Sequence, residues 1–390
     1  MKERVVAEVD RNYEWLRGLS QAVWQCHDLG WHEQPAVAAI LSHVRQLDGR
    51  LEIAESLGGF ETAFRVTANT GGPGPHVATI AEYDAVAGIG QACGHNLISS
   101  ATVGALAGLL PVLGELSGRF SIYGTPAEES GGAKMLMEDA GVFEDIDALL
   151  MFHPKDINTV GQRSLTLIPL VIEFRGHAVH AAAFPFQGRN ALDAFVNMYV
   201  SISTMRQQLR MDARIHGIIT QGGITPANIP DYTRSEFLCR AADRPYAEHL
   251  VGRVKACAVA AAEASKCEFN FPDPERMAYE SVEPDEGVCA VMRENVQYLG
   301  LPLVENEPIL WASNDAGRMT HRIPTAPLSL SIGDPPLGEH SYEFMDAAAS
   351  DRGDRAFADA AKVLALTAAD LMARGRQSRA SITPRKRSRR

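Results

Sequence analysis

The chain of 390 residues lacks several features that would assign it to a particular class of protein. It has six cysteines and no CxxC pair, which argues against a disulfide framework. Its longest apolar runs, such as 101–113 and 256–264, fall well short of the roughly 20 residues that a membrane span needs. Its first residues lead into mixed charge without the apolar stretch of a signal peptide. We therefore expect a cytoplasmic protein with no membrane partner.

Positive charge is scarce outside the C-terminal end. The net charge is −11, and residues 374–390 hold eight Arg and Lys with no Asp or Glu, so the rest of the chain carries −11 − 8 = −19. An acidic body argues against nucleic acid as a partner. We interpret 374–390 as a basic disordered tail, although such a run could also bind an anionic surface.

The order of predicted elements indicates an α/β fold with an inserted domain. Strands at 77–81, 119–123 and 148–152 alternate with helices, which is typical of a mostly parallel sheet between helices. From about 165 the order becomes strand, helix, strand, strand, helix, strand, the split βαβ pattern of a ferredoxin-like domain. The sequence therefore predicts a discontinuous catalytic domain, 1–168 and 284–373, and an inserted lid domain, 169–283.

Polar groups with metal-binding chemistry gather just after the predicted strands, where open parallel sheets bind their ligands. Thiolate, imidazole and carboxylate suit a divalent ion such as zinc, and more than four of them indicate two ions that share a bridging ligand and a water. A lone His there is more often structural, and a Glu pair is usually solvated. The residues concerned are Asp84, Cys93, His95, Glu128, Glu129, His153 and His340.

The Glu pair is the most informative of these groups. Glu128 and Glu129 follow an apolar strand and a tight Gly/Pro turn at 121–126, where neighbouring side chains point in different directions. One carboxylate can then bind metal while the other remains available as a base.

Three motifs carry a family resemblance: Glu82-Tyr83-Asp84-Ala85, the run 88–96 around Cys93-Gly94-His95, and Gly124-Thr125-Pro126-Ala127-Glu128-Glu129. Together they resemble the amidohydrolase branch of the aminoacylase/carboxypeptidase G metallopeptidases, which includes indole-3-acetyl-amino acid hydrolases and p-aminobenzoyl-glutamate hydrolase. The segments 176–191 and 222–240 resemble the lid of that family. The resemblance extends over roughly residues 10–373.

The resemblance implies a role for each matching residue. Cys93 would bridge two divalent ions, zinc or manganese, with His95, Glu129, His153 and His340 as the other ligands. Glu128 would be the general base, and Asp84 would sit behind the site. His180 of the lid would polarise the scissile carbonyl in the partner subunit of a homodimer, and Asn228 and Arg240 would hold the substrate's carboxylate.

One segment departs from the family pattern. Residues 312–318 carry Asn314 where relatives have threonine, together with an added Arg318. We include Asn314 among the candidate substrate-binding residues, because the change lies near the expected substrate pocket.

We expect a dinuclear metal-dependent amidohydrolase that cleaves N-acyl or N-aroyl amino acids or small dipeptides. Two alternatives stay open: an aminohydrolase that releases ammonia from an aromatic amine, and an inactive homologue that binds a ligand. The complete set of ligands and base argues against the second alternative.

Overall fold

Two units, each with its own sheet, make up the chain. The computed structural model describes residues 1–47, 50–274, 277–304 and 309–374. Unit 1 comprises Met1–Arg163, Glu283–Ile309 and the chain from Arg318 onward, and unit 2 comprises Ser164–Val282 and Leu310–Gly317. Of the expected basic tail, only Arg374 lies within the described residues.

Unit 1 is built on a seven-stranded sheet in the order β1-β2-β4-β3-β5-β11-β6. The central strands β4, β3, β5 and β11 are parallel, while β1, β2 and β6 pair antiparallel. The prediction of an α/β fold with a mostly parallel sheet is confirmed. The strands are β1 (Glu52–Glu55), β2 (Phe64–Asn69), β3 (His76–Ala81), β4 (Arg119–Gly124), β5 (Ala148–Lys155), β6 (Thr159–Val160) and β11 (Thr325–Ser331).

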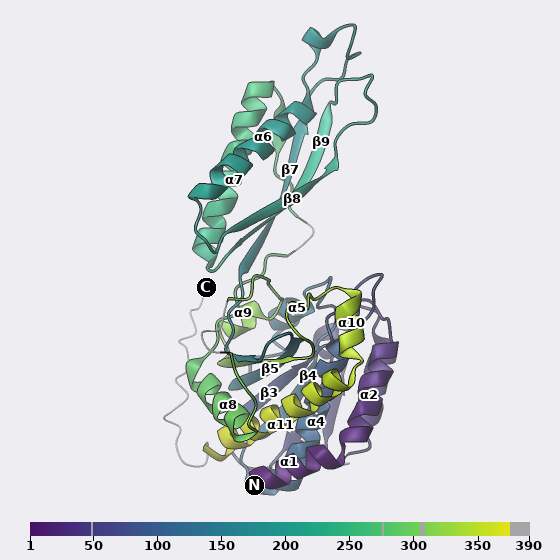
Figure 1. Cartoon of the computed structure of the whole chain (residues 1–390), viewed down its shortest axis with the longest axis vertical. Coiled ribbons are helices and arrows are strands. Elements are labelled where there is room, and N and C mark those ends of the chain that lie inside the picture. Colours follow the sequence, from purple (N-terminus) through teal and green to yellow (C-terminus); the bar gives the residue numbers. More distant parts are fainter. Residues whose placement is uncertain (48–49, 275–276, 305–308, 375–390) are drawn as a thin grey trace. The chain divides into compact units, whose positions relative to one another are not determined.

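Helices cover both faces of this sheet. Figure 1 shows the larger group of helices, which includes α4 and α11, below the strands. Helices α1 to α4, α8 and α11 share the larger core, and α5 and α9 lie against the opposite face. The helices are α1 (Lys2–Arg11), α2 (Tyr13–Gln25), α3 (Gln34–Val44), α4 (His95–Leu109), α5 (Ala133–Asp139), α8 (Glu286–Tyr298), α9 (Gly317–Thr320), α10 (Tyr342–Ala348) and α11 (Asp351–Arg374).

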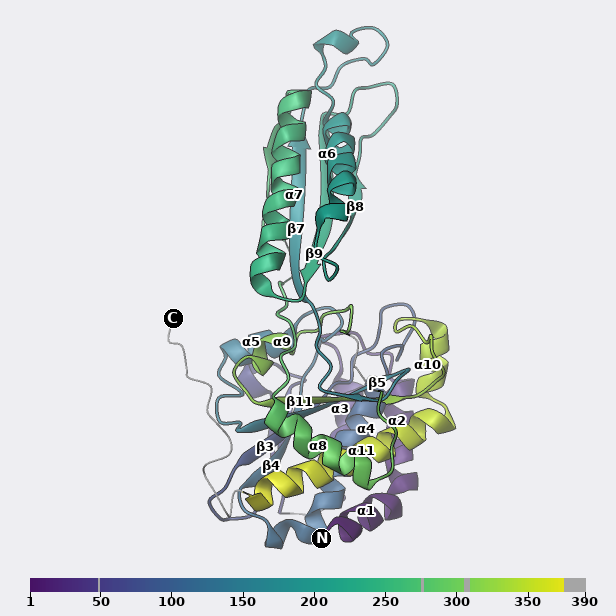
Figure 2. The same cartoon turned by 60° about the vertical axis from the view of Figure 1, so that its left-hand side comes forward.

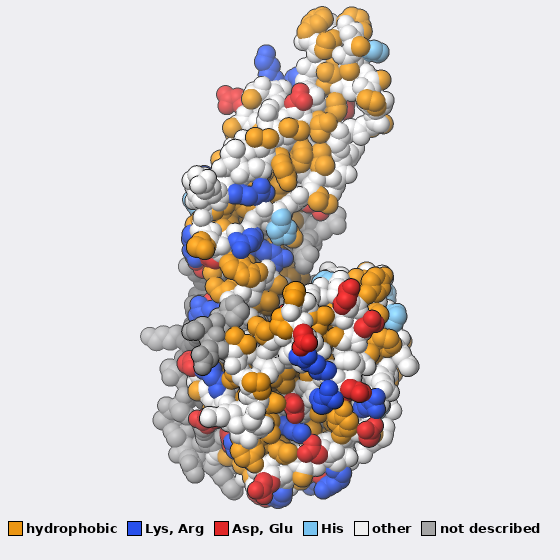
Figure 3. All heavy atoms as spheres, in the orientation of Figure 1, with side chains coloured by type: hydrophobic (Ala, Val, Ile, Leu, Met, Phe, Trp, Pro, Cys, Tyr) orange, Lys and Arg blue, Asp and Glu red, His pale blue; other side chains and the backbone are white. Residues whose placement is uncertain are grey.

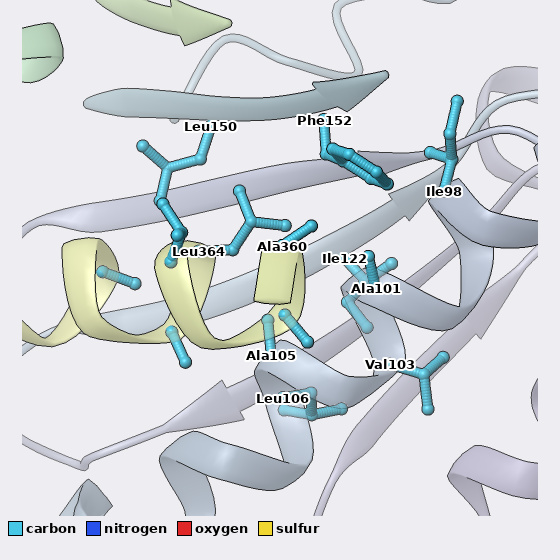
Figure 4. Packing of buried hydrophobic residues seen from close by; sticks show 14 of the residues in the cluster. Ile98, Ala101, Val103, Ala105, Leu106, Ile122, Leu150, Phe152, Ala360 and Leu364 are labelled. Atoms are coloured by element: carbon cyan, nitrogen blue, oxygen red, sulfur yellow. The ribbon is translucent and has the colours of Figure 1, made fainter. Parts of the chain in front are cut away.

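Strand alternation explains why both faces are buried. In β5, Leu150 and Phe152 enter the larger core while Leu149 enters the smaller one. Figure 4 shows Leu150 and Phe152 above small residues of α4 and α11, among them Ala105 and Ala360. Small side chains let these two helices approach closely, so α4 lies under the strands and its first turn reaches their carboxyl ends.

Helix α4 continues into a 3-10 turn, η2 (Leu110–Glu115). The combined segment His95–Glu115 is long and apolar enough to cross a membrane. The sequence did not predict this, because its apolar run 101–113 is only a part of the segment. However, 78% of its apolar window is buried inside the protein, as is typical of a core helix.

Unit 2 is an antiparallel sheet with two helices on one face, and Figure 2 shows these helices, α6 and α7, side by side along the strands. Its strand order β10-β7-β9-β8, with a helix after β7 and another after β9, is that of a split βαβ unit. The 310–317 segment belongs to unit 2 rather than to unit 1, because Ala312 O accepts a hydrogen bond from Leu165 N and Ser313 Oγ accepts one from Arg240. The elements are β7 (Thr166–Arg175), α6 (Ala191–Met205), β8 (Arg214–Gln221), β9 (Tyr232–Ala241), α7 (Arg244–Ser265) and β10 (Glu268–Asn270).

Two expected helices are each broken in the structure. The apolar periodicity of 4–25 predicts one helix, but the Asn12 side chain donates to Glu8 O and the chain restarts at Tyr13. The expected final helix, 344–373, is divided into α10 and α11, with Ser350 Oγ accepting from Gly353 N at the start of α11. At Ser350 the side chain takes a backbone N–H that a continuous helix would pair, whereas Glu8 O accepts from both the backbone and the side chain of Asn12.

A buried histidine at the start of β3 makes the stability of unit 1 depend on pH. His76 is buried, with Nδ1 2.9 Å from Asp145 O and Nε2 2.8 Å from Ser121 Oγ. Burial and the nearby Arg119 lower the pKa of His76. Its neutral form therefore stabilises the fold at pH values above about 6.5, and this contribution is lost as the pH falls through the lowered pKa.

We predict that His76→Gln will lose less stability than the wild type when the pH is lowered from 7.5 to 5.5. Gln can make similar hydrogen bonds but does not take up a proton. Urea denaturation at the two pH values measures this difference. Equal losses in both proteins would show that His76 does not titrate in this range.

Candidate metal centre

The proposed metal ligands come together at the carboxyl edge of the sheet in unit 1. Their donor atoms form three overlapping groups, in each of which the atoms lie within 4.8 Å of one another. The groups are Cys93, His95 and His153; Cys93, Glu129 and His340; and His95, Glu128 and Glu129. Cys93, His95 and Glu129 each belong to two of the groups, and Cys93 is the member shared by the group with His153 and the group with His340, as a bridging thiolate would be.

The topology explains why residues so distant in sequence meet. Strands β3, β4 and β5 are parallel neighbours, so the segments that follow β3 and β4 emerge at one edge beside the end of β5. His153 lies within β5, two residues before its end, rather than just after the strand as expected. His95 is the first residue of α4, and His340 lies in the loop before α10.

Two histidine rings are oriented by backbone carbonyl groups. His95 Nδ1 lies 2.7 Å from Asp84 O, and His153 Nδ1 lies 2.9 Å from Pro154 O. In the neutral ring both Nδ1 atoms therefore carry the proton, and both Nε2 atoms have a lone pair. Although burial opposes ionisation, the hydrogen bond and charge of Asp84 raise the pKa of His95 well above its usual value, so a bound ion must displace a proton from this ring. His153 Nε2 lies 3.4 Å from the sulfur of Cys93. Imidazoles held in this tautomer are suited to bind a metal through Nε2.

Two of the proposed ligands have a buried donor atom with no hydrogen-bond partner among the described residues. These atoms are His95 Nε2 and Glu129 Oε1, which lie 3.9 Å apart. An unpaired buried polar atom is rare and needs a partner such as an ion. Because both atoms are typical metal donors, the residues present fit a divalent cation.

The electrostatics of the cluster also favour bound cations. Although burial opposes ionisation, hydrogen bonding to His340 and the charge of His95 lower the pKa of Glu129 to about 2. Burial, and then the charge of Glu129, raise the pKa of Cys93 well above its usual value. The thiol is therefore protonated without metal, and a bound ion must displace its proton.

Asp84 links the two sides of the cluster. It is 1% exposed, its Oδ1 lies 3.2 Å from His95 Nδ1, and its Oδ2 accepts a hydrogen bond from Glu129 N at 3.0 Å. This placement agrees with a role behind the site, because the Asp84 carboxylate contacts the ring of His95 and the backbone N–H of Glu129, and both of these residues are proposed ligands.

The remaining candidates belong to unit 2. His180 and Asn228 form an antiparallel bridge, and Asn228 lines an open cavity of about 440 Å³. Arg240 donates to Ser313 Oγ at 2.7 Å, and Asn314 Oδ1 accepts from Ala316 N at 3.2 Å. The catalytic role of His180 and the substrate-binding roles of Asn228, Arg240 and Asn314 stay predictions.

The added Arg318 belongs to unit 1 and has a structural partner there. Its Nε donates to Glu138 Oε2 at 2.6 Å, and its Nη2 lies 2.8 Å from Asp139 Oδ1. Both acidic residues belong to α5, so Arg318 ties its own helix, α9, to α5.

Sequence reasoning missed a buried ion pair beneath the cluster. Lys134 is 0% exposed, and its Nζ lies 2.8 Å from Glu82 Oε1. The other oxygen of Glu82 lies 3.5 Å from His95 Nε2. A second missed pair, Lys155 with Glu339, lies beside His153. Glu82 lies in a motif of the sequence, but no local pattern reveals that Lys134 is buried.

We predict that Lys134→Met will destabilise unit 1 by about 3–5 kcal/mol, because the buried Glu82 then loses its lysine partner. The double variant Lys134→Met with Glu82→Gln should recover most of this loss, since the buried charge is gone. Denaturant unfolding of the metal-free proteins measures both effects. If Lys134→Met alone is as stable as the wild type, the pair does not carry this energy.

Comparisons with known proteins show which proteins this chain resembles. The model of peptidase family M20/M25/M40 matches residues 74–369. The chain is 32% identical to the Xaa-Arg dipeptidase of Mus musculus, over 95% of this chain and 89% of that protein. It is 29% identical to one of the subunits of p-aminobenzoyl-glutamate hydrolase from Escherichia coli, over 69% of this chain and 59% of that protein.

A solved structure shares the fold. It is a Bacillus subtilis protein described as a dinuclear metal binding peptidase from the M20 family. The TM-score is 0.70 at 18% identity, with 93% of this chain and 99% of that chain covered. The family resemblance expected from the sequence is confirmed.

Proposed function

The chain belongs to peptidase family M20/M25/M40, a family of hydrolases that act on C–N bonds, and from this premise we propose a dinuclear metal-dependent dipeptidase or N-acyl amino acid hydrolase. The observation that carries the proposal is the pair of three-ligand groups that share Cys93, with Glu128 beside them. Because the Xaa-Arg dipeptidase relative matches 95% of the chain, Xaa-Arg dipeptides are the first substrates to test.

The residues of the centre would have two roles, metal binding and proton transfer. Cys93, His95 and His153 would hold one ion, and Cys93, Glu129 and His340 the other. Two such ions, zinc or manganese, would lower the pKa of water and polarise the substrate's carbonyl. Glu128 accepts the proton of the attacking water and returns it to the leaving nitrogen.

His180 is suited to donate a hydrogen bond to the substrate. It is exposed, and its Nδ1 accepts hydrogen bonds from Ala182 N at 3.3 Å and Ala183 N at 3.1 Å. The proton of the neutral ring is therefore on Nε2, which can stabilise negative charge on the carbonyl oxygen. The cationic Arg240 and the amides of Asn228 and Asn314 would bind the substrate's carboxylate.

We further propose that the protein is a homodimer formed through unit 2, which acts as the lid. On α6, Val196, Tyr199 and Val200 are 48%, 39% and 54% exposed and lie on one helical face. Figure 3 shows hydrophobic side chains gathered on the face of unit 2 that carries α6. In the described part of the chain β8 pairs with β9 alone, so its outer edge is open to a second copy.

The function is tested by a substrate panel on protein reloaded with zinc or with manganese. We predict hydrolysis of dipeptides or N-acyl amino acids, and Glu128→Gln should lower turnover by about 10²–10⁴-fold while metal content stays at two ions. Ammonia release from aminobenzoates serves as the comparison reaction. Turnover of aminobenzoates alone would overturn the proposal in favour of an aminohydrolase. Loss of metal in Glu128→Gln would make Glu128 a ligand.

Complementation tests the dimer and His180 together. We predict that His180→Ala subunits and Glu128→Gln subunits, each inactive alone, will regain activity when they exchange. A hybrid dimer holds one site in which an intact Glu128 can face an intact His180 from the partner. Confirmed subunit exchange without recovered activity would show that His180 does not act across the interface.

A further inference from the structure

The turn that carries Glu128 has an unfavourable backbone conformation. Ala127, directly before Glu128, has a φ of +50° and is fully buried. The left-handed region is unfavourable for a residue with a Cβ, so surrounding contacts must hold Ala127 there. Without such contacts the turn would relax and move the carboxylate that follows it.

Two buried carboxylates accept hydrogen bonds from the backbone on either side of Glu128. Glu33 Oε1 accepts from Ala127 N at 2.8 Å, and Asp84 Oδ2 accepts from Glu129 N at 3.0 Å. The residue between these two anchored peptide groups is Glu128. Asp84 already belongs to the metal centre, whereas Glu33 comes from the start of α3 and contacts no proposed ligand in the described structure.

Glu33 is itself held in place. Its side chain is 0% exposed, Oε1 also accepts from Trp31 N at 3.0 Å, and Oε2 accepts from Thr62 Oγ1 at 2.8 Å. Its loop lies directly against the turn, since a Cβ on Gly30 would approach the Cβ of Ala127 to 2.9 Å. A carboxylate this buried requires such hydrogen bonds, and here one of them reaches the strained peptide.

We propose that Glu33 is a positioning residue for Glu128: it holds the Ala127 peptide in its left-handed conformation and so fixes the direction of the base. This inference rests on the proposed role of Glu128. A displacement of about 1 Å at a catalytic group can lower the rate on the order of 100-fold, so a distant carboxylate can control turnover.

The first test replaces the hydrogen-bond acceptor. Glu33→Met removes both oxygens at similar size, and we expect kcat to fall about 10- to 100-fold with KM and metal content unchanged. Glu33→Gln keeps one oxygen for Ala127 N and should retain most of the activity. The matched control is Thr62→Val, which removes the contact to Oε2 alone and should keep kcat near the wild-type value.

The second test is rescue at the strained residue. Glycine adopts a positive φ freely, so Ala127→Gly should restore much of the kcat of Glu33→Met. A residue that only fills space would not be rescued in this way. If Glu33→Met does not fold, Glu33→Asp retains the charge but is one methylene shorter, and the same loss and rescue are expected. A loss of kcat that Ala127→Gly does not restore would overturn the proposal.

The third test does not depend on activity. Hydrogen exchange of the 125–132 segment in the metal-free protein should be faster in Glu33→Met than in the wild type, and unchanged in Thr62→Val. Unchanged exchange in Glu33→Met would overturn the inference. If the wild type hydrolyses none of the substrates, the proposed function fails, yet exchange still decides whether Glu33 holds the turn.

Discussion

A carboxylate loses several kcal/mol of hydration when it is buried, unless hydrogen bonds or an opposite charge replace the water. The carboxyl edge of the sheet in unit 1 buries Glu33, Glu82 and Asp84 beside a thiol and an imidazole. Each carboxylate meets this constraint with a different partner: Glu82 with Lys134, Asp84 with Glu129 N and the His95 ring, and Glu33 with backbone and hydroxyl groups. These partners set the geometry of the centre.

The same constraint applies to the proposed ligands, some of whose buried atoms have hydrogen-bond partners among the residues that the structure describes while others have none. The Nδ1 atoms of His95 and His153 face carbonyl oxygens, so the rings are oriented before any ion binds. His95 Nε2 and Glu129 Oε1 have no hydrogen-bond partner within the described chain. A centre with oriented ligands and open donor atoms loses little entropy when it takes up cations, and its acidic surroundings favour them.

Unit 2 differs from unit 1, because the residue proposed to act there, His180, lies on its surface. His180 is exposed, and the backbone amides of Ala182 and Ala183 set its tautomer without burial. The exposed apolar residues of α6 and the open edge of β8 indicate surfaces that a partner can cover. Fewer contacts hold His180 than hold the groups of the candidate metal centre, which is consistent with its proposed role of reaching a substrate.

The sequence by itself determined the class of fold, the family and the residues that gather at the metal centre, because motifs after parallel strands emerge at one edge of a sheet. Only the tertiary structure decided which donor atoms group with Cys93 and that Lys134 is buried against Glu82. It also decided that Arg318 ties α9 to α5 and that Glu33 reaches the turn before Glu128. Glu33 and Ala127 are 94 residues apart, and the two partners of each contact lie on different elements. Local periodicity and motif spacing describe neighbours along the chain, whereas these contacts arise when separate elements pack together.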